Sequence, residues 1–230
     1  MNIFSKIFGK LFKKNKREAT SSPKQPTPSL TILMAINPEI ENKGECEDLL
    51  KDQAKKLSFL NPATVLIDTI KDYKDYNRFC KQDLANAFDT DFVLVIQRDG
   101  KVLNPTAWDN EFFKYDYIGA PWKVQYGWIC KMLAAQKKDI ANKDLLVGNG
   151  GFSLRSKKFC ELVAKNFKDA YNEDAFACVA IRDKMEAAEI KFAPYEVARK
   201  FSVENDVYSG QFGAHRMIVK NGQKVSVVEV

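Results

Sequence analysis

The stretch Phe92-Val-Leu-Val-Ile-Gln-Arg-Asp-Gly100 decides the predicted fold of this 230-residue chain. Its first five residues are all apolar, which is typical of a strand that is buried on both faces of a parallel sheet. The next four residues are polar or glycine, so we expect the chain to leave the sheet there with Asp99 at the rim. Asp-Gly is also common turn chemistry, and the local pattern alone favours a turn over a ligand site.

Two strand and helix units precede this stretch. Residues 30–36 and 63–68 are short apolar runs that predict two further buried strands. Residues 45–58 and 75–88 predict the helices that follow them. Alternation of strand and helix is typical of a parallel α/β sheet with right-handed crossovers.

The second half of the chain is less regular. We expect a short strand before a loop that ends at Trp122, and a glycine turn that leads into a strand near residue 155. Ser156 predicts the cap of a helix to about residue 170, and Glu173 begins a helix to about residue 189. The remaining expectations are helix and surface loop over 123–145, extended chain over 196–203 and an edge strand over 225–230.

The net charge of +6 comes from the N-terminal arm. Residues 1–24 hold seven of the 36 basic residues and one of the 30 acidic residues, so the rest of the chain is balanced. A nucleic-acid-binding domain usually carries its positive charge on the folded part. We therefore expect no nucleic-acid partner.

The arm itself predicts a membrane-surface helix over residues 1–18. Large apolar residues recur every three to four positions with lysines on the other side, which is typical of a helix lying in a membrane interface. The alternative is a helix packed on the protein's own core. Residues 19–29 hold three prolines among Ser and Thr, which predicts a flexible linker. We expect residues 1–17 to contact an anionic membrane surface and residues 30–230 to form one domain.

The five cysteines are scattered without any Cys-x-x-Cys pair, and the chain has one histidine. A Cys/His zinc site is therefore not expected. Buried thiols in a reducing compartment are the favoured interpretation.

Candidate donor-site residues follow the predicted strands. Asn37, Asp68 and Asp99 stand at the carboxyl ends, where open parallel sheets bind ligands. A carboxylate at that edge can hold a divalent metal that neutralises a diphosphate.

Three later features could carry chemistry, each beside a plainer interpretation. The segment Gly148-Asn149-Gly150-Gly151 has three glycines, which would let the backbone approach a ligand closely or adopt positive φ angles. Glu173 and Asp174 supply a possible general base, although acids also favour helix starts. His215, the single histidine, is a possible metal ligand, although a lone histidine is more often structural.

Taken in order, these segments resemble a known family. The first is the range 92–122, which begins with FVLVIQRDG (92–100) and ends with YDYIGAPW (115–122). The others are VGNGGFSLRS (147–156), NEDAF (172–176), FAPYEVARKFSVE (192–204) and FGAH (212–215). The series is similar to a bacterial and fungal family of GT-A-like glycosyltransferases that often accompany surface-glycan biosynthesis, and it covers roughly residues 30–216. The resemblance implies an α/β fold of GT-A-like (Rossmann-like) type, with a mixed, mostly parallel sheet flanked by helices.

The resemblance also implies roles for single residues. Asp99 would contact metal and pyrophosphate with Gln97 beside it, and His215 would be the late metal ligand. Trp122 and the segment 148–151 would line the acceptor and the donor sugar. Asp174, with Glu173 next to it, would be the base of an inverting transfer from a nucleotide-diphosphate sugar to a glycan or lipid-linked saccharide. Such an enzyme would be cytoplasmic and peripheral on the inner face of the membrane.

One position departs from the family pattern. The usual acidic metal motif has two carboxylates, and Gln97 holds the first place here. The sequence still favours Mn²⁺ or Mg²⁺, with one histidine favouring Mn²⁺. A non-catalytic sugar- or nucleotide-binding module, a nucleotide-sugar hydrolase and a membrane-recruited scaffold remain as alternatives.

Overall fold

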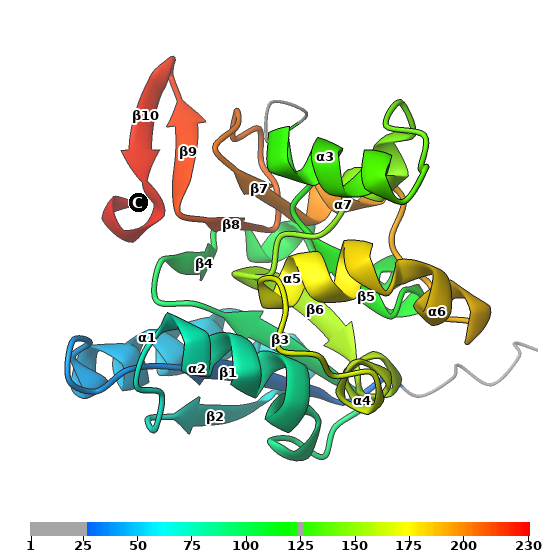
Figure 1. The fold of residues 1–230 in the computed structure, drawn as a ribbon. Coiled ribbons are helices and arrows are strands. Elements are labelled where there is room, and N and C mark those ends of the chain that lie inside the picture. The colour runs from blue at the N-terminus through cyan, green and yellow to red at the C-terminus, as the bar shows by residue number, and fades with distance from the viewer. Residues whose placement is uncertain (1–26, 124–126) are drawn as a thin grey trace, which may run out of the picture.

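The structure is a computed structural model that describes residues 27–123 and 127–230 (Figure 1). The predicted helix over residues 1–18 and most of the linker over 19–29 lie outside the described residues. Among the helices of the described ranges, none is long and apolar enough to cross a membrane.

A five-stranded sheet forms the centre of the fold, in the order β2-β1-β3-β6-β5. Its strands are β1 (Leu30–Ala35), β2 (Ala63–Ile67), β3 (Phe92–Ile96), β5 (Tyr117–Gly119) and β6 (Phe152–Ser156). The first three strands are parallel, as the apolar runs predicted. β6 is antiparallel to both of its neighbours, β3 and β5. The sheet is therefore mixed, as predicted: β6 is reversed, and the other four strands run in one direction.

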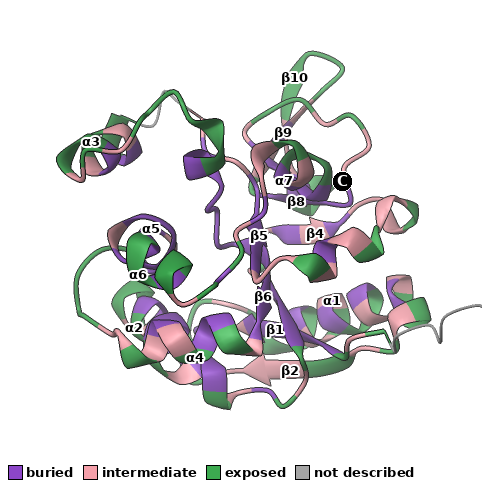
Figure 2. Ribbon diagram, turned by 90° about the vertical axis from the view of Figure 1, so that its right-hand side faces the viewer, coloured by how far each residue is buried: buried purple, intermediate pink, exposed green. Residues whose placement is uncertain are grey.

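Helices cover both faces of this sheet, which Figure 2 shows nearly edge on. On one face, alternate residues such as Leu33, Val93 and Val95 pack with the helices α2 (Tyr73–Arg78), α4 (Lys157–Lys165) and α6 (Arg182–Ala187). On the other face, Ile32 and Leu94 pack with α1 (Lys43–Lys56) and α7 (Tyr195–Phe201). This alternation follows from the two-residue period of a strand, and it gives the sheet an apolar core on each side.

Several helices deviate from the ideal form or from their predicted bounds. α2 continues through a π-helical turn (Phe79–Asp83) and a 3-10 turn (Leu84–Asn86), which together span the predicted helix over 75–88. The helix predicted from Glu173 is interrupted: α5 (Glu173–Ala175) passes into a π-helical turn (Phe176–Ala180) before α6. α3 (Gly127–Ala135) lies within the predicted range 123–145. Ser156 caps α4 as predicted, because its Oγ accepts from the Phe159 amide at 3.0 Å.

A smaller three-stranded sheet lies beside the main one, in the order β4-β8-β7. It consists of β4 (Gly100–Val102), β7 (Ser202–Glu204) and β8 (Gly213–His215). β9 (Met217–Lys220) and β10 (Gln223–Ser226) then form the hairpin coloured orange to red in Figure 1. The register of the small sheet sets His215 opposite Gly100 on one side and opposite Glu204 on the other. That register determines the site described below.

Three further expectations were wrong. β2 is the edge strand of its sheet and is partly exposed, so it is not the buried strand predicted for residues 63–68. Residues 195–201 are helical (α7), and only the last two residues of the predicted extended stretch, 202 and 203, lie in a strand (β7). The predicted final strand over 225–230 is instead the end of β10 followed by a 3-10 turn (Val227–Glu229). Four of the cysteines are buried thiols, as expected, and Cys130 is half-buried.

Candidate functional site

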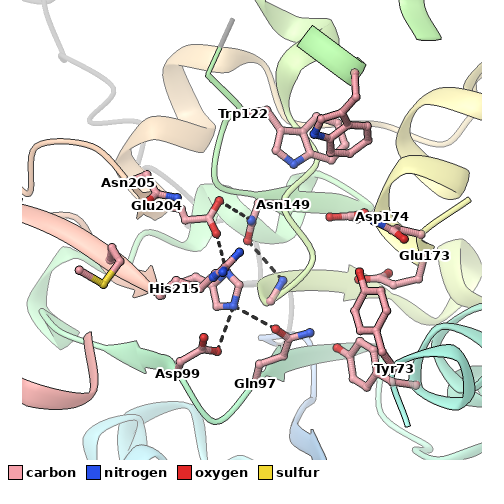
Figure 3. Close-up of a pocket in the computed structure, with 16 residues that line it drawn as sticks. Tyr73, Gln97, Asp99, Trp122, Asn149, Glu173, Asp174, Glu204, Asn205 and His215 are labelled. Atoms are coloured by element: carbon pink, nitrogen blue, oxygen red, sulfur yellow. Dashed lines mark hydrogen bonds and ion pairs between the residues drawn. The ribbon is translucent and has the colours of Figure 1, made fainter. Parts of the chain in front are cut away.

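A cavity of about 680 Å³ opens where the two sheets meet, and we call it the central cavity. Its volume is within the range of small-molecule sites. Figure 3 shows its wall, to which both sheets and the segment around α5 contribute. The lining residues are Tyr73, Tyr76, Gln97, Asp99, Trp122, Trp128, Asn149, Gly151, Asn172, Glu173, Asp174, Glu204, Asn205, His215, Arg216 and Met217.

His215 lies at the centre of a polar cluster in this cavity. Its Nε2 atom lies 3.0 Å from Gln97 Oε1 and 3.1 Å from Asp99 Oδ1. Its Nδ1 atom lies 3.2 Å from Glu204 Oε1, close enough for an ion pair. Burial lowers the pKa of His215, but the hydrogen bonds and charges of Asp99 and Glu204 outweigh burial and raise the pKa above its ordinary value. The cluster therefore joins the ends of β3, β7 and β8.

Backbone hydrogen bonds fix the members of this cluster. The Gln97 amide donates to the Gly151 carbonyl at 2.9 Å, which extends the β3–β6 pairing by one residue. The Arg216 amide donates to the Asp99 carbonyl at 2.8 Å. Because both bonds come from sheet pairing, Gln97 and Asp99 are held beside His215 by rigid elements.

The charge around Asp99 favours its ionised form. Burial raises the pKa of Asp99, but the hydrogen bond and the charge of His215 outweigh burial, so the pKa lies below its ordinary value. Glu204 is buried and also accepts from Asn149 Nδ2 at 2.8 Å. The cluster thus brings together four of the residues that the sequence pointed to, Gln97, Asp99, Asn149 and His215.

The glycines of 148–151 make room for side chains. A Cβ atom at Gly151 would clash with the His215 ring, and one at Gly150 would clash with the Glu173 carboxylate. A Cβ atom at Gly148 would clash with the Trp122 ring. Among the described glycines only Gly210 and Gly222 have positive φ, so positive φ does not explain this motif. Asn149 and Gly151 line the central cavity, whereas Gly148 and Gly150 lie behind it.

Glu173 and Asp174 differ in their surroundings although they are adjacent. Glu173 is buried in a two-point ion pair with Arg155, with Oε2 at 2.9 Å from Nη1 and Oε1 at 3.1 Å from Nη2. Asp174 is half-buried on the cavity wall. Burial and the negative charge of Glu173 raise the pKa of Asp174 to about 7. Asp174 is therefore the acid that can exchange a proton near neutral pH.

The loop before Asp174 is held by two buried polar residues. Lys81 is 2% exposed, and its Nζ donates to the carbonyls of Lys168, Ala170 and Tyr171 at 3.2–3.4 Å. The Glu173 amide donates to Asn77 Oδ1 at 2.6 Å. The side chain that caps α5 thus comes from Asn77 of α2.

A second cavity of about 350 Å³ lies at the ends of β1 and β3, and we call it the strand-end cavity. It adjoins the central cavity, since Tyr73, Tyr76, Gln97 and Asp99 line both. Asn37 lines the strand-end cavity as expected, although its side-chain Nδ2 already donates to the Lys71 carbonyl at 2.5 Å.

Asp68 is a correction to the predicted site. It lines neither cavity, and its carboxylate pairs with Lys43 Nζ at 2.7 Å on the exposed surface. That hydrogen bond and charge lower the pKa of Asp68. The edge position of β2 explains the error: β2 ends at the same edge of the sheet as β1, but β1 separates it from β3, whose end carries Gln97 and Asp99.

Sequence reasoning missed several residues of the central cavity, and three of them matter most for its chemistry. Arg216 is exposed there with φ of 58°, a backbone conformation that is uncommon for a residue with a side chain. Glu204 faces His215 across the small sheet. Tyr76 has a buried hydroxyl that makes no hydrogen bond of acceptable geometry with any described residue. Two of the three carried a signal, Glu204 as the last residue of the segment 192–204 and Arg216 as the residue directly after His215.

Residues 61–215 match the family described as "Protein of unknown function (DUF5672)". No curated protein sequence matches the chain. The matched range includes every member of the His215 cluster, the glycine segment and both acids, and it ends at His215 itself.

Proposed function

We propose that this chain, which belongs to the DUF5672 family, is a nucleotide-sugar-dependent glycosyltransferase of GT-A-like fold. One observation carries the proposal: Asp174, with its pKa raised to about 7, lines the same cavity as the His215, Asp99 and Gln97 cluster. A proton acceptor and a site for a charged leaving group therefore face one cavity (Figure 3). The reaction would be an inverting transfer.

The strand-end cavity supplies the proposed nucleoside site. Ile40 and Tyr73 line it and are 78% and 64% exposed, so two large apolar side chains are available to contact a base. Large apolar groups exposed beside a cavity are typical of binding sites. Tyr76 lines both cavities, and its buried hydroxyl would donate a hydrogen bond to the ribose or the phosphate.

The residues around His215 fit a divalent metal. His215 Nε2, Asp99 Oδ1 and Gln97 Oε1 converge, and one nitrogen with two oxygen ligands suits Mn²⁺ better than Mg²⁺. Glu204 at the other ring nitrogen supplies the carboxylate that metal-binding histidines usually have. In the described residues no three Asp, Glu, His or Cys side chains form a metal-ligand group, and Glu204 is near the Nδ1 atom of the ring and not near Nε2. The glutamine thus completes the set, and a bound metal would offset the charge of the diphosphate.

Arg216 supports the same leaving group. Its guanidinium is exposed in a cavity whose other ionisable side chains, apart from His215 and the tyrosines, are carboxylates. Guanidinium groups bind phosphate oxygens with two parallel hydrogen bonds. With its positive φ, Arg216 lines the central cavity while its backbone amide donates to the Asp99 carbonyl.

The proposed step is a single displacement. The acceptor hydroxyl oxygen forms a bond to the anomeric carbon as the bond from that carbon to the diphosphate oxygen breaks. The diphosphate keeps the electron pair of the broken bond. Asp174 Oδ takes the hydroxyl proton, for which a pKa near 7 is well matched. Trp122 and Trp128, with ring centroids 6.0 Å apart, form an aromatic wall on which a sugar ring can stack.

The biological setting remains that proposed from the sequence. The acceptor would be a glycan or lipid-linked saccharide in surface glycan or lipopolysaccharide biosynthesis. Residues 1–17 would hold the enzyme at the cytoplasmic face of the membrane through anionic lipid. The charge balance beyond the arm argues against nucleic acid as a partner.

Release of nucleoside diphosphate from a panel of nucleotide sugars tests the activity. The wild-type chain should release one nucleoside diphosphate in the presence of Mn²⁺ and a saccharide acceptor, and Asp174→Asn should not. Release that needs no acceptor would identify a hydrolase. Binding of a nucleotide sugar without turnover by the wild type would identify a non-catalytic module.

A further inference from the structure

A third pocket, which we call the lateral pocket, adjoins the central cavity. It has a volume of about 460 Å³ and shares Trp122 and Glu204 with the central cavity. Its wall also includes Lys143, Tyr195, Arg199 and Ser202. The proposed transfer gives this pocket no role so far, although it lies one side chain away from the site of that transfer.

Ser202 is a buried polar residue in the wall of the lateral pocket. This residue is 1% exposed, and its hydroxyl makes no hydrogen bond of acceptable geometry with any described residue. A buried hydroxyl without a partner is unfavourable, so native proteins rarely retain one without a purpose. A bound molecule with a hydrogen-bonding group would satisfy it.

The charges of the lateral pocket leave a positive surplus. Among its acids, Glu204 is engaged by His215 and Asn149, and Asp206 pairs with Lys123 at 3.4 Å. Lys143 makes no ion pair with any described residue, and its Nζ lies 5.3 Å from the centroid of the Tyr195 ring.

Arg199 adds to this surplus. It pairs only with Glu196 in the described part of the chain, at 3.5 Å between two exposed side chains. Such an exposed pair is weak and is easily exchanged for a ligand.

The remaining wall suits a sugar ring. Trp122 and Tyr195 offer aromatic faces, and the rim includes polar groups such as Gln211 and Ser209. Saccharide sites combine flat apolar faces with hydrogen-bonding groups in this way. An aromatic face, a buried hydroxyl and two available cations together describe the recognition of an acidic sugar.

We propose that the lateral pocket binds an acceptor saccharide that carries an anionic group. The carboxylate or phosphate of that saccharide contacts Lys143 and Arg199, and a ring hydroxyl bonds Ser202. Trp122 separates this saccharide from the donor sugar in the central cavity. As a statement about an acceptor the inference rests on the proposed function, and as a statement about an anionic-sugar site it can be tested without turnover.

The test is a titration of the full chain, followed by NMR, with a hexuronic acid, a hexose 6-phosphate and the matching neutral hexose. At least one acidic sugar should bind about tenfold more tightly than the neutral hexose. The double variant Lys143→Ala/Arg199→Ala should lose that preference. Lys51→Ala, on the exposed face of α1, is the matched control and should keep it. Comparing the two acidic sugars identifies the group as carboxylate or phosphate.

A second variant separates binding from folding. Ser202→Ala removes a hydroxyl that has no partner, so the melting temperature should stay the same or rise while all three sugars bind more weakly. Equal binding of neutral and acidic sugars, or a preference that survives in the double variant, would overturn the proposal. Nucleoside diphosphate binding, measured on the same samples, keeps the two claims distinct. A wild-type protein that prefers acidic sugars but binds no nucleoside diphosphate contradicts the proposed function. One that binds a nucleoside diphosphate but does not prefer acidic sugars contradicts this inference.

Discussion

The Glu173 carboxylate and the Arg155 guanidinium form a two-point ion pair in the core, with both side chains buried and the shorter contact at 2.9 Å. Arg155 also donates to the Gly150 carbonyl at 3.2 Å, so the pair ties the glycine segment to α5. The negative charge of Glu173 lies next to Asp174 and helps to raise its pKa. Of the two neighbouring acids, one therefore builds the site and the other is available for chemistry.

The first prediction separates these two acids by substitution. Glu173→Gln leaves the Arg155 charge buried without its partner, which should destabilise the fold by about 3–5 kcal/mol. Asp174→Asn should keep or raise the melting temperature at pH 7, because burial and Glu173 disfavour the ionised carboxylate that it replaces, and it should lower turnover by about 10²- to 10⁴-fold. Thermal unfolding and initial rates of both variants check this. A Glu173→Gln protein as stable as the wild type, or an active Asp174→Asn protein, would contradict the assignment.

The second prediction concerns the pH dependence of the rate. A base must be ionised to accept a proton, and Asp174 has a pKa of about 7. The value of kcat/KM should therefore fall about tenfold per unit below pH 7 and level off above it. Initial rates over this range, in several buffers, test the expectation. A rate that is constant from pH 5 to pH 7 would exclude Asp174 as the base on this account.

The third prediction concerns stability against pH and does not require a substrate. The pKa of Asp174 rises from 3.8 to about 7 on folding, so the folded state binds a proton that the unfolded state has lost between these values. Stability from this group should decrease as the pH rises through that window. Denaturant unfolding of the wild type and of Asp174→Asn at several pH values measures the difference. No change in that difference between pH 4 and pH 7 would be inconsistent with the raised pKa.

The fourth prediction tests the glycine segment. Gly151→Ala introduces a Cβ atom into the space of the His215 ring, so the ring should move away from Asp99 and Gln97. Stabilisation of the protein by Mn²⁺ should then disappear, although the chain still folds. Gly44→Ala is the matched control, because a Cβ atom there meets only Asn42 Oδ1 at an ordinary 3.4 Å. A Gly151→Ala variant that keeps the full Mn²⁺ effect would show that the glycine is not required by the histidine.

The fifth prediction concerns Tyr76. Tyr76→Phe removes a buried hydroxyl that has no well-formed hydrogen bond to a described residue, so the melting temperature should not fall. The affinity for the nucleoside diphosphate should drop about three- to tenfold, because one hydrogen bond to the ligand is lost. Calorimetric titration of both proteins measures this. Loss of stability with unchanged affinity would assign the hydroxyl a structural role instead.

The main sheet was largely predictable because local patterns determine it. The run 92–96 is apolar throughout and the run 30–36 has Thr31 as its one polar residue, and short runs of this kind are typical of strands buried on both faces. The exposed position of β2 was not predictable from its own residues, since the order of strands in a sheet depends on contacts that are distant in the chain. The helix α7 was missed because it begins and ends with the aromatic residues Tyr195 and Phe201, which have lower helix propensity than the Ala, Arg and Lys between them.

The candidate site divides in the same way. Gln97, Asp99 and His215 were named from motifs, and the β4–β8 register brings them together. Glu204 was missed because only the pairing of β7 with β8 shows that it faces His215. Asp68 was wrongly included because it follows an apolar run like the others. The glycines at 148, 150 and 151 were correctly singled out. Their neighbours, however, are the side chains of Trp122, Glu173 and His215, and the local sequence does not show these long-range contacts.

The most direct test of the central claim is thermal unfolding of the full chain with a panel of nucleoside diphosphates, each with and without Mn²⁺. The account predicts that one nucleotide raises the melting temperature only when Mn²⁺ is present, and that Asp99→Ala abolishes this shift. At about 100 times the dissociation constant the stabilisation should be about 2.7 kcal/mol, a shift of several degrees. A folded wild-type protein that shows no shift with any nucleotide would contradict the proposed donor site, and with it the glycosyltransferase.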